Sequence, residues 1–396
     1  MPVPRPRLAA STALRLARQY PVLTLTGPRQ SGKTTMARSI FKNKPYLTME
    51  DPDLLRISTD DPRGFLAQYP HGAILDEVQK APHLFSYIQR IVDEHNKPGF
   101  YVLTGSQNFQ LMANISQSLA GRSAILHLLP FSLAEAYPRV RPEIEELLFR
   151  GFYPRIFDKK LDPSEAMAFY VSTYVERDVR QLLNVKDLRL FQTFLRLCAG
   201  RTAQEVNYSA LANECGVNHN TVKSWISILE TSFLITLVRP HYENLGKRLT
   251  KSPKLHFVDP ALVCYLLGIE SPKQLATHPQ RGAIFESWVA TEFLKQRYNA
   301  ARNNNQFYFR ENNGQEIDLV LDHGETVDAI EVKSGKTYAP DFFRNILKYR
   351  AANPACRSGT VVYAGKDSQR VGENQLLSYR ELDKEQQLAQ KKKVKK

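Results

Sequence analysis

Hydrophobic residues follow two alternating patterns along the first 130 positions. Short apolar runs occur at residues 22–27, 72–79 and 99–106, and apolar residues recur at helical spacing at residues 33–41 and 85–95. Strands that alternate with helices are typical of a parallel sheet with covering helices. The sequence therefore predicts an α/β domain in this part of the chain.

The pattern changes beyond this domain. Residues 142–203 lack strand-like runs and carry apolar residues at helical spacing, which predicts a helical subdomain. Residues 207–238 read as a short helix, a turn at Gly216, a second helix and a strand, and residues 254–259 supply a partner strand. This order predicts a winged helix-turn-helix.

A polar segment with two prolines, residues 271–282, predicts a linker before a mixed α/β region. The last residues are basic and should be frayed. The predicted organisation is an α/β core at 1–140, a helical lid at 141–204, a winged helix-turn-helix at 205–270, a mixed α/β domain at 271–381 and a flexible basic tail at 382–396.

Composition narrows the choice of partner and compartment. The chain of 396 residues has 54 Lys and Arg against 40 Asp and Glu, a surplus that favours a polyanionic partner, nucleic acid before a membrane surface. No apolar run approaches the roughly 18 residues that span a bilayer. The four cysteines lack paired spacing, which disfavours a zinc knuckle or a disulfide scaffold and favours a reducing cytoplasm.

The first 22 residues admit two interpretations. They are rich in arginine and contain no acidic residue, as organelle transit peptides are. The favoured interpretation is a helix that includes Leu8, Leu14 and Leu16 and leads directly into the first strand.

A phosphate-binding motif follows the first predicted strand. Residues 27–35, GPRQSGKTT, match GxxxxGK[ST] at the start of a helix. Glycines let the backbone wrap phosphates, Lys33 would neutralise the β- and γ-phosphate oxygens, and Thr34 would hold Mg²⁺. The expected ATP contacts are Gly27, Pro28, Arg29, Gln30, Ser31, Gly32, Lys33, Thr34, Thr35 and Ser106.

Further groups on neighbouring segments complete the expected ATPase site. Asp76 would join the Mg²⁺ shell, and Glu77 would orient or activate the attacking water. Ser106 or Asn108 would sense the γ-phosphate, or else form a strand-capping turn. Two arginines, Arg122 and Arg155, are candidate fingers, from the same or a neighbouring subunit, with ordinary surface arginines as the alternative.

In this order, the motifs LTGPRQSGKTT, ILDEVQ, VLTGS, LAGR, LPFSLAE and GFYP resemble a family of prokaryotic AAA+ ATPases with a characteristic C-terminal domain. The resemblance covers nearly the whole chain. It implies a P-loop core, a helical lid, a winged helix and a domain of restriction-endonuclease-like fold. It also implies the Walker roles for Lys33, Thr34, Asp76 and Glu77, and makes Arg122 a candidate trans-acting residue in a homo-oligomer.

The predicted hairpin of residues 316–335 carries the residue types of a PD-(D/E)XK nuclease. Two-residue alternation puts Glu331 and Lys333 on one face, Asp318 lies on the preceding strand, and Glu286 would add a metal ligand from a helix. The residue before Asp318 is Ile317 rather than proline. Three interpretations stay open: a metal-dependent nuclease, a nuclease-like fold that binds without cutting, and an ordinary charged hairpin.

The second helix of the predicted winged helix is the candidate DNA reader. Its Asn220 and Lys223 would face the major groove, and Lys247 and Arg248 would lie on the wing near phosphates. The alternative is a winged helix packed as a lid or an oligomer contact. The leading hypothesis is a DNA-binding ATPase coupled to a nuclease-like domain; a nucleotide-gated regulatory switch and a protein remodeller are the alternatives.

Overall fold

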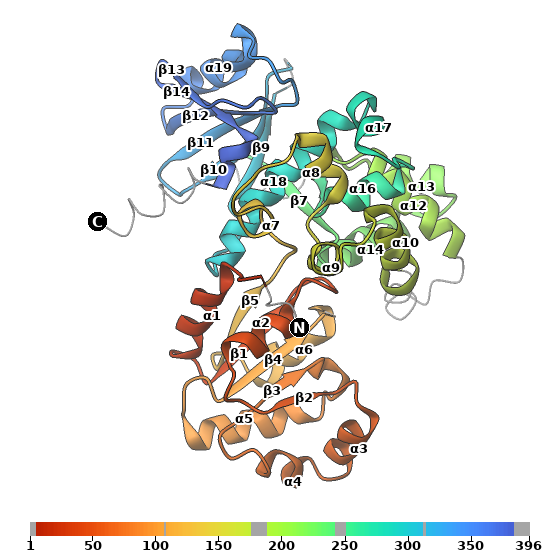
Figure 1. Ribbon diagram of the computed structural model, residues 1–396, viewed down its shortest axis with the longest axis vertical. Coiled ribbons are helices and arrows are strands. Elements are labelled where there is room, and N and C mark those ends of the chain that lie inside the picture. Colours follow the sequence, from red (N-terminus) through yellow and green to blue (C-terminus); the bar gives the residue numbers. More distant parts are fainter. Residues whose placement is uncertain (1–4, 107, 176–187, 242–250, 312–313, 384–396) are drawn as a thin grey trace.

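The computed structural model describes residues 5–106, 108–175, 188–241, 251–311 and 314–383. Figure 1 shows the N-terminal domain below, a helical region above it and, beside that region, a domain that contains the C-terminal strands. None of the described helices is long and apolar enough to cross a membrane.

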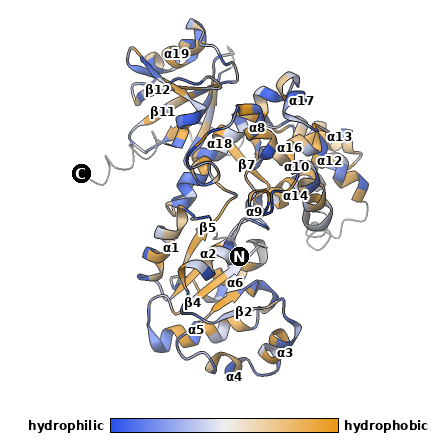
Figure 2. Cartoon of the chain, in the orientation of Figure 1, coloured by the Kyte–Doolittle hydropathy of each residue, from blue (hydrophilic) through white to orange (hydrophobic). Residues whose placement is uncertain are grey.

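The N-terminal domain is built on one five-stranded sheet with the order β2-β3-β4-β1-β5, in which every pair is parallel. Central strands are buried on both faces and read as continuous apolar runs, which Figure 2 shows in orange. The strands are β1 (Val22–Thr26), β2 (Tyr46–Thr48), β3 (Ile74–Asp76), β4 (Tyr101–Gly105) and β5 (Ser123–His127).

Helices cover this sheet, as the alternating pattern predicted. They are α1 (Ala9–Ala17), α2 (Lys33–Ile40), α3 (Pro52–Asp60), α4 (Pro62–Ala67), α5 (Leu84–His95) and α6 (Asn108–Ser118). The expected helix before the first strand is α1, which buries Ala9, Ala13 and Leu16 against the sheet and leaves Leu8 and Leu14 exposed. The domain is therefore α/β with a parallel sheet.

A helical region follows, and its start sites are set by local capping. Asn218 caps the second helix of a helix-turn-helix pair through the backbone of Thr221, and Gly216 ends the first helix in the left-handed conformation. The helices are α7 (Leu133–Ala136), α8 (Ile144–Arg150), α9 (Pro154–Lys159), α10 (Pro163–Tyr170), α12 (Leu188–Gly200), α13 (Tyr208–Cys215), α14 (His219–Thr231), α16 (Pro260–Leu266) and α17 (Pro272–Thr277).

The second sheet has nine strands in the order β13-β14-β12-β11-β10-β9-β7-β8-β6. The predicted hairpin is confirmed, because β10 and β11 pair antiparallel. The strands are β6 (Gln204–Glu205), β7 (Ile235–Pro240), β8 (Lys254–Phe257), β9 (Gln306–Arg310), β10 (Glu316–Asp322), β11 (Val327–Lys333), β12 (Cys356–Tyr363), β13 (Gln369–Val371) and β14 (Asn374–Ser378).

One sheet therefore joins two segments that the sequence separated by a linker. Strand β7 pairs antiparallel with β8 on one side and parallel with β9 on the other. The long helix α18 (Arg281–Asn299) packs on β8, β11 and β5, and α19 (Arg344–Ala352) covers β12. Because α18 contacts both sheets, it links the N-terminal domain to the C-terminal strands (Figure 1).

Candidate functional sites

The loop between β1 and α2 has the backbone that a phosphate cradle requires. A Cβ on Gly27 would lie 2.1 Å from the carbonyl oxygen of Leu128, and Gly32 has a φ of +88° at the N-cap of α2. Both positions therefore need glycine. The N–H groups of the first turn of α2 and the helix dipole favour an anion at this point.

Lys33 is the first residue of α2, and its side chain turns back onto the preceding loop. Its Nζ donates to the carbonyl oxygens of Gly27, at 3.0 Å, and Pro28, at 2.8 Å. Within the described part of the chain, the buried Oγ of Ser31 has no hydrogen-bond partner. A phosphate oxygen would satisfy such a donor, so the loop fits the anion that the motif predicts.

Asp76 ends β3 and is held by neutral donors. It accepts hydrogen bonds from Thr34 Oγ1, at 2.9 and 3.1 Å, from the Tyr46 hydroxyl, at 2.7 Å, and from Thr104. The hydroxyl of Thr34 and the carboxylate of Asp76 are thus adjacent oxygen donors of the kind that Mg²⁺ prefers. The two residues that the sequence assigned to the Mg²⁺ shell lie together.

Glu77 comes next and takes an unusual backbone conformation with a φ of +51°. Its Oε2 accepts from Gln79 Nε2, at 2.5 Å, and from Ser106 Oγ, at 3.2 Å. The sequence predicted that Ser106 contacts the γ-phosphate and gave no role to Gln79. In the structure both side chains orient the carboxylate of Glu77. The signal for Gln79 was its position in the ILDEVQ motif, two residues after Glu77.

The P-loop borders a cavity of about 490 Å³ that a second segment closes. The cavity is lined by Arg29, Gln30, Gly32, Lys33, Thr34, Thr35, Glu77, Pro154, Arg155, Asp158 and Lys159. The last four belong to α9, more than a hundred residues along the chain from the P-loop. Of the two candidate finger arginines, Arg155 therefore lies at this site.

Arg122 lies elsewhere. It precedes β5, where its carbonyl oxygen accepts from Val22 at the amino end of β1, while the P-loop follows the carboxyl end of β1. Its guanidinium makes two hydrogen bonds to Asp93, at 2.5 and 2.8 Å. The expectation that Arg122 acts on the nucleotide of its own chain is wrong, because parallel strands put the two positions at opposite edges of the sheet.

The sequence also did not reveal that Arg7 holds the P-loop against the segment that follows β5. Arg7 donates to the carbonyl oxygens of Ser31, at 2.5 Å, and Leu129, at 2.7 Å, and to Glu135, at 3.0 Å. The segment 129–135 is also bound by side chains of α18. The backbone N–H of Leu133 donates to Glu292, and Lys295 donates to both Glu292 and the carbonyl oxygen of Phe131.

A second set of charged groups lies in the nine-stranded sheet. We use "carboxylate cluster" for Glu286 of α18, Glu316 and Asp318 of β10, and Glu331 of β11. Lys333 Nζ is 2.5 Å from Glu331 Oε2, and Asp318 accepts from the backbone N–H of Val332 at 2.7 Å. The structure thus brings together the four residues that the sequence assigned to a nuclease site.

An unexpected residue is also present in the cluster. Lys254 of β8 places its Nζ 2.6 Å from Glu316, 3.2 Å from Glu286 and 4.0 Å from Asp318. Among the described residues, no group of three or more His, Cys, Asp or Glu side chains is placed to hold a metal ion. The cations at this site are Lys254, Lys333 and, 3.9 Å from Glu316, Arg310.

Burial and crowding change the acidity of these carboxyls. Burial, and then the charge of Asp318, raise the pKa of Glu286 and of Glu331 to about 8. Burial also raises the pKa of Asp318. Burial lowers the pKa of Lys254, but the charges of Glu286, Asp318 and Glu316 outweigh it and raise this pKa above its ordinary value.

The candidate DNA-reading residues are only partly visible. Asn220 and Lys223 are exposed on α14, as expected of side chains that face a partner. Lys247 and Arg248 lie outside the described residues. The exposed face of α14 is therefore the part of this prediction that the structure can place.

Three parts of the chain match known protein families. Residues 19–137 match a family described as an AAA domain, residues 141–273 match a domain of unknown function, DUF8612, and residues 281–382 match another, DUF4143. Lys254 thus belongs to the second matched segment, and the carboxylate cluster belongs to the third.

Two similar proteins are mycobacterial. The chain is 29% identical over 348 residues to the uncharacterized proteins Rv2008c of Mycobacterium tuberculosis and Mb2031c of Mycobacterium bovis, covering 86% of this chain and 76% of each relative. Among solved structures, a Walker-type ATPase of Pyrococcus abyssi is 15% identical with a TM-score of 0.44, covering 65% of this chain and 94% of that one. AMPPCP-bound DnaA from Aquifex aeolicus is also 15% identical, with a TM-score of 0.28, covering 56% and 86%.

The matched segment of residues 19–137 contains the parallel sheet, the P-loop and the Asp76–Glu77 pair. In P-loop ATPases, such parts bind and hydrolyse a nucleoside triphosphate. The N-terminal part of this chain is therefore similar to an AAA domain, and the match includes the residues that its P-loop motif predicts for nucleotide binding.

Proposed function

We propose that the protein is an ATP-hydrolysing switch in which α9 responds to the nucleotide bound at the P-loop. Lys33 would hold the β- and γ-phosphates, Thr34 and Asp76 would hold Mg²⁺, and Glu77 would accept a proton from the attacking water. When bound, Mg²⁺ supplies charge neutralisation at the phosphates. Gln79 and Ser106 keep Glu77 directed toward its task through their hydrogen bonds.

The observation that carries this proposal is the position of Arg155. It lines the nucleotide cavity from α9, which belongs to the helical region and not to the ATPase sheet. An arginine that contacts the γ-phosphate from a second segment stabilises charge that develops during hydrolysis and is released when the phosphate leaves. Movement of α9 would then report the state of the nucleotide.

The experiment is Arg155→Ala in the full chain, with ATP hydrolysis and ATP affinity measured separately. We expect hydrolysis to fall by about 10²-fold or more, with a much smaller change in affinity. Arg196→Ala, which removes an exposed arginine of α12, is the matched control. Unchanged hydrolysis in the Arg155 variant would refute this role.

We further propose that the exposed face of α14 binds DNA and that ATP gates this binding. Asn220 and Lys223 of α14 would make the contacts, together with Lys247 and Arg248, which lie outside the described residues. The helix-turn-helix pair, its flanking strands β6, β7 and β8, and the net charge of +14 support the proposal. If it is correct, Lys223→Ala should weaken DNA binding and flatten its salt dependence, whereas exposed Lys273→Ala should not.

Metal-dependent cleavage of DNA at the carboxylate cluster is a second candidate function. The buried Oε1 of Glu331, which lacks a hydrogen-bond partner in the described part of the chain, is the observation that favours it. Asp318→Ala and Glu331→Ala should then both abolish cleavage of single-stranded, double-stranded or branched DNA with Mg²⁺ or Mn²⁺. Absence of cleavage by the wild-type protein, with ATP hydrolysis stimulated by DNA, would favour the non-cleaving switch. Absence of any DNA effect on hydrolysis would favour a protein remodeller.

A homo-oligomer in the cytoplasm belongs to the same proposal. All four cysteines are buried and unpaired, which agrees with a reducing compartment.

In an oligomer Arg122 would act on the nucleotide of a neighbouring subunit. Arg122→Ala should then lower hydrolysis only at protein concentrations where subunits associate, and equal loss in the dilute monomer would contradict that role.

A further inference from the structure

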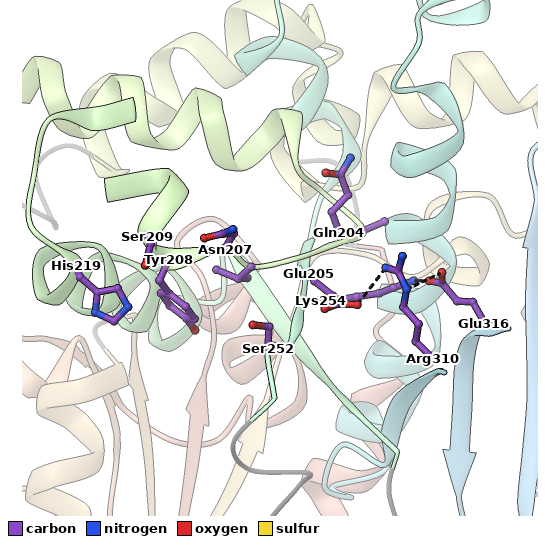
Figure 3. Close-up of a pocket in the computed structure, with 12 residues that line it drawn as sticks. Gln204, Glu205, Asn207, Tyr208, Ser209, His219, Ser252, Lys254, Arg310 and Glu316 are labelled. Atoms are coloured by element: carbon purple, nitrogen blue, oxygen red, sulfur yellow. Dashed lines mark hydrogen bonds and ion pairs between the residues drawn. The ribbon is translucent and has the colours of Figure 1, made fainter. Parts of the chain in front are cut away.

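Lys254 reaches the carboxylate cluster from another part of the fold. It lies on β8, while Glu316 and Asp318 lie on β10 and Glu286 lies on α18. Its side chain is 4% exposed, and its Nζ approaches three carboxylates to between 2.6 and 4.0 Å. Figure 3 shows Lys254 beside Glu316 and Arg310 at one end of a cavity of about 780 Å³.

A buried ammonium ion among carboxylates does electrostatically what a metal ion would do. Oxygen ligands bind Mg²⁺ or Mn²⁺ directly, and the ion must lie between the same carboxylates that Lys254 now contacts. A second cation placed near Nζ would be repelled in a region of low effective dielectric constant. Lys254 and a divalent ion would therefore compete for one position.

The fold holds Lys254 in place through the continuity of the sheet. Strand β8 pairs with β7, and β7 pairs in parallel with β9. From β9, Tyr308 donates its hydroxyl to the carbonyl oxygen of Ser252 at 2.7 Å, and its ring centroid lies 5.5 Å from Lys254 Nζ. Lys254 also lines the adjoining cavity, which gives its side chain room to turn away from the cluster.

We propose that Lys254 is a built-in cation that excludes divalent metal ions from the carboxylate cluster and so keeps this site closed. Metal can enter when Lys254 is withdrawn. This inference deepens the second candidate function and is independent of ATP hydrolysis. Its test measures metal binding and not DNA cleavage. A failure of this inference can therefore be distinguished from a failure of the proposed nuclease activity.

The test is Mn²⁺ binding to the full chain without nucleotide, measured by calorimetry and by electron paramagnetic resonance. We expect Lys254→Met to bind Mn²⁺ at least about tenfold more tightly than the wild type, because removal of a buried competing charge favours the ion. The double variant Lys254→Met/Asp318→Asn should lose this gain. Lys251→Met, which removes an exposed lysine three residues earlier, should bind as the wild type does.

Two further measurements keep the test decisive if Lys254→Met folds poorly. Glu316→Gln removes the shortest ion pair of Lys254 and should give a smaller gain in the same direction. Mn²⁺ should also raise the melting temperature of either variant more than that of the wild type. The proposal is overturned if neither variant gains affinity, or if the wild type already binds Mn²⁺ as tightly in a manner that Asp318→Asn abolishes.

Discussion

The P-loop site and the carboxylate cluster use the same residue types but pair them in opposite ways. At the P-loop, Lys33 is held by backbone carbonyl oxygens, and Asp76 is held by hydroxyl donors. In the cluster, the ammonium groups of Lys254 and Lys333 lie directly on carboxylates. The P-loop site therefore keeps its charges for a ligand, whereas in the carboxylate cluster the charges of the protein neutralise one another.

This difference shows why residue identity alone does not define a site. Neutral donors orient Asp76 without cancelling its charge, so a metal ion and a triphosphate still gain from binding there. Direct ion pairs satisfy both partners, and a ligand must first displace one of them. The comparison predicts that substitutions at the P-loop remove function, whereas those at the cluster change stability and metal access.

The largest effect is expected for Lys33→Met. Hydrolysis of ATP should fall by about 10²–10³-fold, because Lys33, at the start of α2, is the cation that the motif places on the β- and γ-phosphates. Lys42→Met, at an exposed position just after α2, is the matched control. Turnover at the wild-type rate in the Lys33 variant would mean that the P-loop is not the catalytic site.

A smaller effect is expected for Arg7→Lys. Lysine keeps the charge near Glu135 but cannot make all three hydrogen bonds that tie Ser31 and Leu129 together. We expect ATP affinity to fall by about tenfold, the value of one lost hydrogen bond to a charged group. Titration with a fluorescent nucleotide measures it, and Arg15→Lys on the exposed side of α1 should bind normally.

The smallest effect is on the pH dependence of the free energy of unfolding, through Glu331 of the carboxylate cluster. Glu331 has an ordinary pKa of 4.5 and a folded-state pKa of about 8, so the folded protein retains a proton that the unfolded chain releases. This contribution to stability is complete below pH 4.5 and is lost as the pH rises through about 8.

Glu331→Gln cannot titrate, so its melting temperature should fall less than that of the wild type between about pH 5 and about pH 9. The difference should correspond to at least about 1 kcal/mol, since one pKa unit is worth about 1.4 kcal/mol. Glu325→Gln, at an exposed position of the same hairpin, should follow the wild-type curve. Parallel curves for all three proteins would show that Glu331 is ionised in the fold.

Local sequence predicted the parts of both sites that lie on adjacent segments. The P-loop is contiguous, and Asp76 and Glu77 directly follow a short apolar strand. The hairpin that carries Asp318 and Glu331 is also local, and its register follows from two-residue alternation. Only the role of Arg122 on the nucleotide of its own chain was wrong, because sequence shows that an arginine adjoins a strand but not at which edge of the sheet it lies.

The sequence by itself determined the alternation of strands and helices around the P-loop, the β10–β11 hairpin and the residue types at each site, because these depend on periodicity, glycine conformation and short-range spacing. It did not reveal that the predicted linker contains α17. Tertiary structure alone decided that Arg155 reaches the nucleotide cavity, that Arg7 supports the P-loop, and that Lys254 fills the carboxylate cluster. These contacts join distant segments. They arise when sheets and helices bury their apolar faces together, and no local pattern encodes which charged side chains are then brought into contact.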